Sequence, residues 1–209
     1  MRNGKEFKTI LENHELWLSS NKAQGSRAEL IGKNLSGWDL SGTDLSGVDL
    51  TDANLRGTNL RGADLIGANL NYADLSGANL SNANICNAKM LGADLSKAVL
   101  KGADLHSAML RGVKLMEANL SGADLSGANL YGAELMGADL SSANFNEANL
   151  SFANFSGIDL SKAQMVCARY NKHTIFTKGF NPKDNGMELN KRKQVYERLP
   201  LRRSVEGTL

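Results

Sequence analysis

The chain has 209 residues, of which 42% are hydrophobic, and a formal net charge of +2 at pH 7. This length suits one ample domain. The balanced charge excludes a protein whose whole surface follows nucleic acid, so we expect no direct nucleic-acid partner. Two cysteines cannot form a disulfide framework, which favours a reducing, cytoplasmic location. There is no run of about 18 apolar residues, so we expect no membrane partner.

The first segment with a clear pattern is an amphipathic helix predicted over residues 4–19. Its apolar side chains recur at helical spacing, with Trp17 beside them: Phe7, Ile10, Leu11, His14 and Leu18. Asn3 and Glu6 have the spacing of a capping box at the start of this helix.

The segment after this helix has an unbroken five-residue period. From Leu30 to Tyr170, every fifth residue is apolar, and the place two residues earlier is usually Ala. The place between them is Asp or Asn in most copies. Neither a helix of period 3.6 nor a strand of period 2 keeps a residue on one side at a spacing of five. The chain must therefore bend once in each repeat.

If each repeat forms one side of a square, four repeats bring the chain back above its start. The ladder then makes about seven coils, with the Leu and Ala side chains pointing inward. Gly is the commonest residue two places after the central Leu, which suits a tight corner. Other residues also occupy this place, so we expect a positive φ there to be favoured but not required: Asp52, Tyr72, Lys97, Glu117 and Phe152.

Repeats such as Ser121-Gly122-Ala123-Asp124-Leu125 resemble the A(D/N)Lxx motif of the pentapeptide-repeat family. The resemblance covers residues 28–172. It implies an all-β fold, a right-handed quadrilateral parallel β-helix. The motif is specific for the fold but not for function, because it is a pattern of core packing.

The two ends of such a rod need covers, because an open end exposes apolar side chains and unpaired backbone groups. We expect residues 1–27 to form a capping helix and lead-in, with Phe7, Leu11, Trp17 and Trp38 in the cap. A partner-binding helix is the alternative. Trp38 and Lys33 stand in places sized for Ala, which predicts an irregular first coil with Trp38 under the helix and Lys33 turned outward.

Residues 173–209 are expected to form a closing segment and a basic tail. The stretch 174–182 looks like the closing stretch common in this family, with Phe176 and Phe180 lying across the last coil. Residues 187–199 have the spacing of a weak basic helix that ends at Pro200. A solvated, partly disordered tail is the favoured interpretation, and the helix is the alternative.

No pattern of catalytic residues is present. The histidines are isolated, no Cys/His spacing matches a metal site, and no nucleophile or phosphate-binding motif occurs. We therefore expect no enzyme activity, no catalytic residue, no cofactor and no metal. The repeated Asp residues are expected to pair with the backbone at corners. Cys86 and Cys167 lie four coils apart, beyond disulfide reach, so two free thiols are expected.

Outward residues can be sorted by side, because the sides recur every 20 residues. One side and the next corner gather a set that we call the apolar strip: Tyr72, Leu91, Met109, Met116, Tyr131, Met136 and Phe152. An apolar strip on a polar rod is typical of an interface. We therefore expect a rigid protein–protein interaction scaffold whose partner is another protein or a second copy. The alternatives are a tail or helix folded back over the strip, and scattered surface residues.

Another side stacks the residues that we call the acidic column: Asp44, Asp64, Asp104 and Asp124, interrupted by Asn84. Quinolone-resistance members of the family act as DNA mimics on type II topoisomerases, so the resemblance implies an alternative function, modulation of DNA gyrase. The middle of the rod also carries basic residues that dilute this charge: Lys89, Lys97, Lys101, Arg111 and Lys114. A DNA duplex is far more charged, with one charge per about 1.7 Å.

Overall fold

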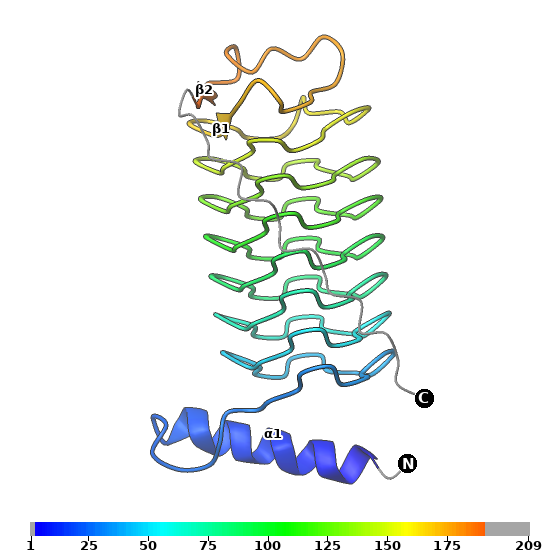
Figure 1. Ribbon diagram of the computed structural model, residues 1–209, viewed down its shortest axis with the longest axis vertical. Coiled ribbons are helices and arrows are strands. Elements are labelled where there is room, and N and C mark those ends of the chain that lie inside the picture. The colour runs from blue at the N-terminus through cyan, green and yellow to red at the C-terminus, as the bar shows by residue number, and fades with distance from the viewer. Residues whose placement is uncertain (1–2, 191–209) are drawn as a thin grey trace, which may run out of the picture.

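The computed structural model describes residues 3–190, with side chains from Phe7 onward. It contains helix α1 (Asn3–Ser19) and two short strands, β1 (Arg169–Tyr170) and β2 (Glu188–Leu189). Between α1 and β1 the chain winds into a rod of stacked coils. Helix α1 lies across one end of the rod, and an irregular loop closes the other end (Figure 1).

The coils are held together by parallel backbone pairing between residues 20 apart. The bridges begin with Glu29 and Asp49 and continue to Asn149 and Arg169. Most central residues donate their N–H to the next coil, as Leu95 does to the Lys114 carbonyl at 2.8 Å. The five-residue period is therefore realised as a β-helix in which each coil pairs only with its neighbours.

One continuous apolar core runs through the rod. The central residues from Leu30 to Met165 are buried, together with almost all of the Ala residues two places before them. Thr58 takes the place of one Ala, and its buried hydroxyl donates to the Leu35 carbonyl at 2.9 Å. A buried hydroxyl in this slot is tolerated because that hydrogen bond satisfies it.

The corners correct one expectation. Asp52, Tyr72, Lys97, Glu117 and Phe152 all have φ between 57° and 63°, and the glycines at equivalent corners have φ between 61° and 73°. The left-handed conformation is thus adopted at these paired corners whatever the residue, whereas Lys162, at the corner of the last coil, does not adopt it. It costs a non-Gly residue roughly 1–2 kcal/mol, which the backbone pairing on either side of the corner must offset.

The first coil is regular, contrary to the prediction. Its four sides make the standard bridges to the second coil, starting with Glu29–Asp49 and ending with Asp44–Asp64. Lys33 is exposed, as expected, and Trp38 is half-buried beneath α1. These two residues leave the backbone unchanged because the inward slot of an end coil opens onto the helix and not onto another coil.

Helix α1 packs one face on the first coil, and the predicted helix over 4–19 is confirmed. Phe7 and His14 are buried, whereas Leu16 on the opposite face is 42% exposed. The following loop approaches the helix closely at Gly25, where a Cβ would collide with the backbone of Asn13 and Trp17. The proposed capping box involves Asn3 and Glu6, whose side chains lie outside the described ones.

The closing end departs from the 20-residue spacing. Asn154 bridges Ile175, and β1 pairs in parallel with β2 through Arg169–Glu188 and Tyr170–Leu189. The predicted helix over 187–199 is wrong at its start, because residues 188–189 form β2. Its remainder, from residue 191 onward, lies outside the described residues. Among residues 3–190, no helix is both long and apolar enough to cross a bilayer.

Candidate interaction surfaces

Among the residues whose side chains are described, His14 is the one ionisable side chain that is fully buried. No three His, Cys, Asp or Glu side chains within residues 3–190 are grouped so that they could hold a metal ion. His14 stacks on Trp17, and its Nδ1 accepts the Ala28 N–H at 3.2 Å. Burial lowers the pKa of His14, and the charge of Asp44 only partly opposes this effect. The neutral ring therefore serves to dock α1.

Part of the apolar strip forms a stack of side chains along one corner of the rod. The rings of Tyr131 and Phe152 have centroids 4.9 Å apart, and His173 stacks on Phe152 at 4.8 Å. The Arg111 guanidinium lies over the Tyr131 ring at 5.2 Å, a cation–π geometry. We call Arg111, Tyr131, Phe152 and His173 the aromatic column.

Two members of this column were not predicted from the sequence. Arg111 appeared there only as a charge that dilutes the acidic column, and His173 only as an isolated histidine. Arg111 precedes Tyr131 by 20 residues, so the coil period carried a usable signal. Phe152 and His173 are 21 residues apart, because the spacing changes near the closing end, and no periodic signal marks that contact.

Tyr72 and Leu91 occupy the same corner at lower coils. The Tyr72 ring covers Gly92, where an added Cβ would lie 3.0 Å from ring carbons. Tyr72 donates its backbone N–H to the Leu91 carbonyl at 2.9 Å. The structure thus brings Tyr72, Leu91, Tyr131 and Phe152 onto one corner, and all four are half-buried.

The methionines of the strip lie elsewhere. Met109 projects from the side that precedes this corner and is 53% exposed. Met116 and Met136 lie at the next corner, where the Glu117 N–H donates to the Met136 carbonyl at 3.0 Å. Exposed Lys114 and Glu134 occupy the side between the two corners. The strip is therefore two columns with a charged side between them, because neighbouring sides of a coil face different directions.

The acidic column is brought together as the period predicts. Parallel bridges join Asp44 to Asp64 and Asp104 to Asp124, with Asn84 bridging the two pairs. Each of the four carboxylates accepts the backbone N–H two residues further on, at 2.8–3.0 Å. This confirms the expected role of Asp at the corners.

The negative charge of the acidic column affects the ionisation of Cys86. Burial and the charges of Asp104, Asp124 and Asp64 raise the pKa of the Cys86 thiol. Cys86 and Cys167 are both free, as the coil geometry predicted. Both cysteines therefore remain uncrosslinked, and the raised pKa keeps the Cys86 thiol protonated at neutral pH.

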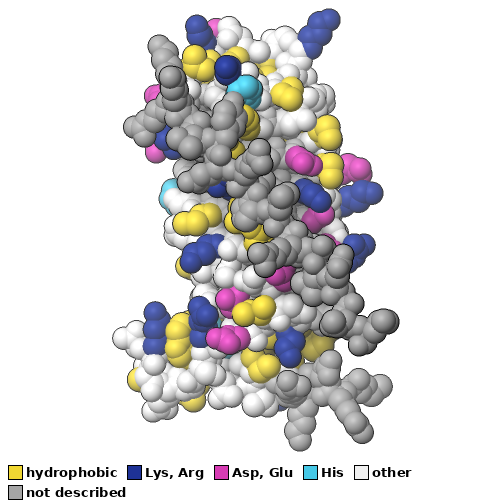
Figure 2. All heavy atoms as spheres, viewed as in Figure 1, with side chains coloured by type: hydrophobic (Ala, Val, Ile, Leu, Met, Phe, Trp, Pro, Cys, Tyr) yellow, Lys and Arg dark blue, Asp and Glu magenta, His cyan; other side chains and the backbone are white. Residues whose placement is uncertain are grey.

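Two of the basic residues in the middle of the rod are paired with acidic residues outside the acidic column. Lys97 pairs with Glu117 and Lys114 with Asp94, each at 3.7 Å, on other sides of the coil. On the face shown in Figure 2, hydrophobic patches alternate with basic and acidic side chains. That face carries no uniform charge.

The two ends of the rod contain the expected covering residues. At the N-terminal end, the Phe7 ring meets Trp38 edge to face with centroids 4.7 Å apart, beside a cavity of about 110 Å³. Leu11 is half-buried against the core, and Trp17 is half-buried against His14. At the other end, Phe176 stacks on Phe155 at 5.8 Å and meets Phe180 at 5.1 Å.

Comparison with known proteins bears on the fold. A family model described as pentapeptide repeats matches the chain in 8 copies, over residues 23–57, 43–82, 78–116, 114–151 and 143–169. No curated protein matches the chain significantly.

Among solved structures, trypsin-treated QnrB1, described as a plasmid-mediated fluoroquinolone resistance protein, has a TM-score of 0.64. It is 22% identical and covers 79% of this chain and 91% of its own, a likeness that shows the fold alone. HetL from the cyanobacterium Nostoc sp. strain PCC 7120, described as involved in heterocyst differentiation regulation, is 36% identical. That match covers 65% of this chain and 71% of HetL, with a TM-score of 0.37.

Proposed function

Because the chain belongs to the pentapeptide-repeat family, we propose that it is a non-catalytic, rigid scaffold that binds a second copy of itself through the corner that carries the aromatic column. In this proposal residues 28–172 form the binding rod, a right-handed four-sided β-helix of about seven coils. The helix and lead-in within residues 3–27 and the closing segment within residues 173–190 cover its ends. The scaffold works in the cytoplasm, where its free thiols stay reduced.

The observation that carries this proposal is the stack of Arg111, Tyr131, Phe152 and His173. Tyr and Arg are the residue types that interfaces favour. Here each ring is already held by the one below it, at 4.8–4.9 Å between centroids. Side chains that are ordered before binding lose less conformational entropy when a partner covers them. A partner that binds this corner therefore pays a smaller entropic cost for ordering its side chains.

The test is the molar mass of the full chain in solution, measured by light scattering. We expect the wild type to be a dimer and the double variant Leu91→Asp, Tyr131→Asp to be a monomer, because two carboxylates at the corner cannot be buried unpaired. The matched control is Ser81→Asp, Ser121→Asp, with the same spacing and repeat position on another corner. A monomeric wild type, or a column variant that stays dimeric, would refute self-association.

A second candidate function is that of a DNA mimic that modulates DNA gyrase. The observation that favours it is the segregation of charge, with four carboxylates on one side and the nearby lysines Lys97 and Lys114 paired on others. A DNA-binding groove would recognise such a face by its negative potential. The fold likeness to QnrB1 is compatible with this candidate.

The test is protection of gyrase supercoiling against a fluoroquinolone. We expect Asp64→Lys, Asp104→Lys to abolish any protection given by the wild type. Asp74→Lys, Asp94→Lys changes the net charge equally on a different side and should retain it. Equal behaviour of the two variants would show that the acidic column is not the contact.

A further inference from the structure

Backbone pairing fails on one side of the last coil. The same side is bridged in the coils below, up to Asn119–Asp139, but no bridge joins Asp139 to Asp159. In the part of the chain that the structure describes, the N–H groups of Leu140 and Asp159 donate to no backbone oxygen. One coil lower, the equivalent N–H of Leu120 donates at 2.8 Å. Residues 157–161 therefore form an extended segment without a partner strand beneath it.

The opposite edge of this segment is also unpaired. In every regular coil the N–H of the central residue points toward the next coil, and Leu160 holds that place here. Within residues 3–190, the Leu160 N–H has no backbone acceptor. The neighbouring sides are covered, because Phe155 donates to the Ile175 carbonyl at 2.7 Å and Cys167 to the Gly186 carbonyl at 2.9 Å. The closing segment thus pairs with the neighbouring sides and leaves this one open.

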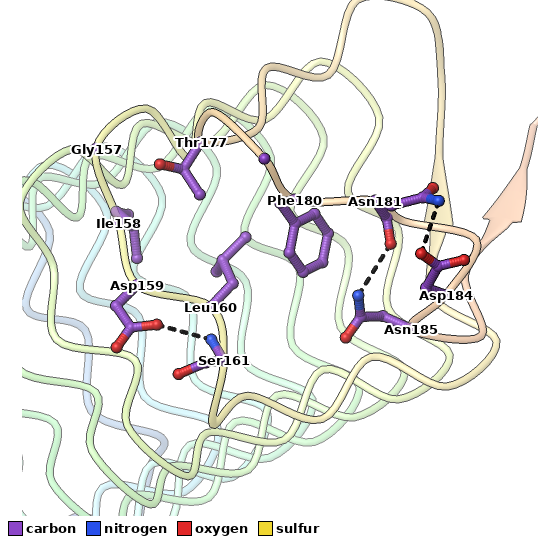
Figure 3. A pocket seen from close by; sticks show the side chains of 11 residues that line it. Gly157, Ile158, Asp159, Leu160, Ser161, Thr177, Phe180, Asn181, Asp184 and Asn185 are labelled. Atoms are coloured by element: carbon purple, nitrogen blue, oxygen red, sulfur yellow. Dashed lines mark hydrogen bonds between the residues drawn. The ribbon is translucent and has the colours of Figure 1, made fainter.

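An open depression of about 550 Å³ lies along this free edge (Figure 3). Residues 157–161 form one wall, and residues of the closing segment, from Thr177 to Asn185, form the other. The side chains of Ile158, Leu160 and Phe180 lie between the two walls; Ile158 and Leu160 are buried, and half-buried Phe180 gives the depression its apolar surface.

Two carboxylates lie on the rim of the depression, and the charge of Lys162 acts on one of them, Asp159. Asp159 and Asp184 line the depression, and no Lys or Arg is among the lining residues. Asp159 accepts the Ser161 N–H at 2.9 Å, and hydrogen bonds with Ser161 lower the pKa of the Asp159 carboxyl, so it is charged at neutral pH. Asp184 accepts a hydrogen bond from the Asn181 amide at 2.8 Å, which fixes its direction.

We propose that this depression binds an extended, basic peptide segment of a partner protein by β-strand addition. The peptide backbone pairs with the free edge at Ile158 and Leu160, whose outward backbone groups have no backbone partner within residues 3–190. One apolar side chain of the peptide packs on Phe180. A Lys or Arg side chain meets Asp159 and Asp184. The site lies at the end of the rod and is independent of the aromatic column.

The first measurement is fluorescence polarisation of the full chain with a labelled Leu-Lys-Leu-Arg-Leu peptide. We expect the sequence Leu-Glu-Leu-Glu-Leu to bind at least tenfold more weakly, because it opposes two carboxylates. Two further versions of the Leu-Lys-Leu-Arg-Leu peptide carry methyl groups on alternate backbone nitrogens. The version methylated on the nitrogens that face the rod should bind at least tenfold more weakly than the parent peptide. The version methylated on the other nitrogens should bind almost as well as the parent peptide. Absence of binding, or equal binding by both methylated peptides, overturns strand addition.

Variants of the protein test whether the charge of Asp159 and Asp184, and not a change in folding, determines peptide binding. Asp159→Asn with Asp184→Asn is expected to weaken binding of the basic peptide at least fivefold. Asn keeps the corner hydrogen bond, as Asn154 shows by accepting the Ser156 N–H at 3.0 Å. Asp139→Asn, one coil lower and outside the depression, is the matched control and should bind like the wild type. Equal loss in the control overturns the assignment of the rim.

Hydrogen exchange tests the free edge directly. The amides of Asp159 and Leu160 should exchange quickly in the full chain without peptide, whereas those of Asp139 and Leu120 should be protected. Addition of the Leu-Lys-Leu-Arg-Leu peptide should slow exchange at Leu160. Slow exchange at Leu160 before the peptide is added would mean that the chain itself or a second copy covers the edge, and it would overturn the proposal of a partner peptide.

Discussion

Leu95→Asp is expected to unfold the middle of the rod. Leu95 is fully buried between coils, and deletion of such a side chain alone costs about 2–5 kcal/mol. An unpaired carboxylate in an apolar core adds several kcal/mol more, against a total stability of about 5–15 kcal/mol for a typical domain. We expect this variant to be unfolded already at 25 °C, so that thermal melting followed by circular dichroism shows no cooperative transition. We also expect new tryptic cleavage at Lys97 and Lys101.

The matched control is Val99→Asp in the same coil. Val99 points outward, is 37% exposed, and stands where most repeats carry Asp or Asn. Its carboxylate can accept the Lys101 N–H, as Asn119 accepts the Ser121 N–H at 2.9 Å one coil further on. We expect a change within about 0.5 kcal/mol. Similar losses in both variants would mean that the inward and outward places are not distinguished as described.

Phe7→Ala is expected to detach and unfold helix α1 while the rod survives. Phe7 is 9% exposed and packs against Trp38, and truncation of a buried Phe costs about 3–5 kcal/mol. A detached helix of 17 residues is marginal in water. The helical signal at 222 nm should therefore fall, whereas the thermal transition of the rod should remain.

Leu16→Ala tests whether this effect comes from docking. Leu16 lies on the same helix but is 42% exposed. Ala also has a slightly better helix propensity than Leu. We expect the helical signal of this variant to match that of the wild type. If both variants lose helix equally, α1 depends on its own propensity and not on its contact with the first coil.

Much of the fold could be predicted from the sequence because the determining pattern is local and repeated. Leu95 and Ala93 are buried for the same reason as Leu75 and Ala73, so one repeat predicts the next. The corner conformation was underestimated because it was inferred from residue preference. Tyr72 and Phe152 adopt a positive φ because the paired strands on both sides of the corner fix its path.

The surfaces were less predictable than the core. The period of 20 assigns Tyr131 and Met136 to neighbouring corners with Glu134 on the side between them, so their separation followed from the spacing, whereas the ring contacts along one corner did not. The open edge at Leu160 has no signal in the sequence, since Leu140 and Leu160 both fit the ladder. Its cause is the path of the closing segment, which no longer follows the repeat.

The 20-residue spacing also fixes the angular relation between the two ends of the rod. Bridges such as Asp104–Asp124 place successive coils in the same orientation, so a column keeps its direction along the whole length. Insertion of 20 residues would lengthen the rod and leave both ends facing as before. Insertion of a single repeat of five would turn everything beyond it by one side. The number of repeats therefore determines the orientation of α1 relative to the closing end about the axis of the rod. Gain or loss of a single repeat changes that orientation.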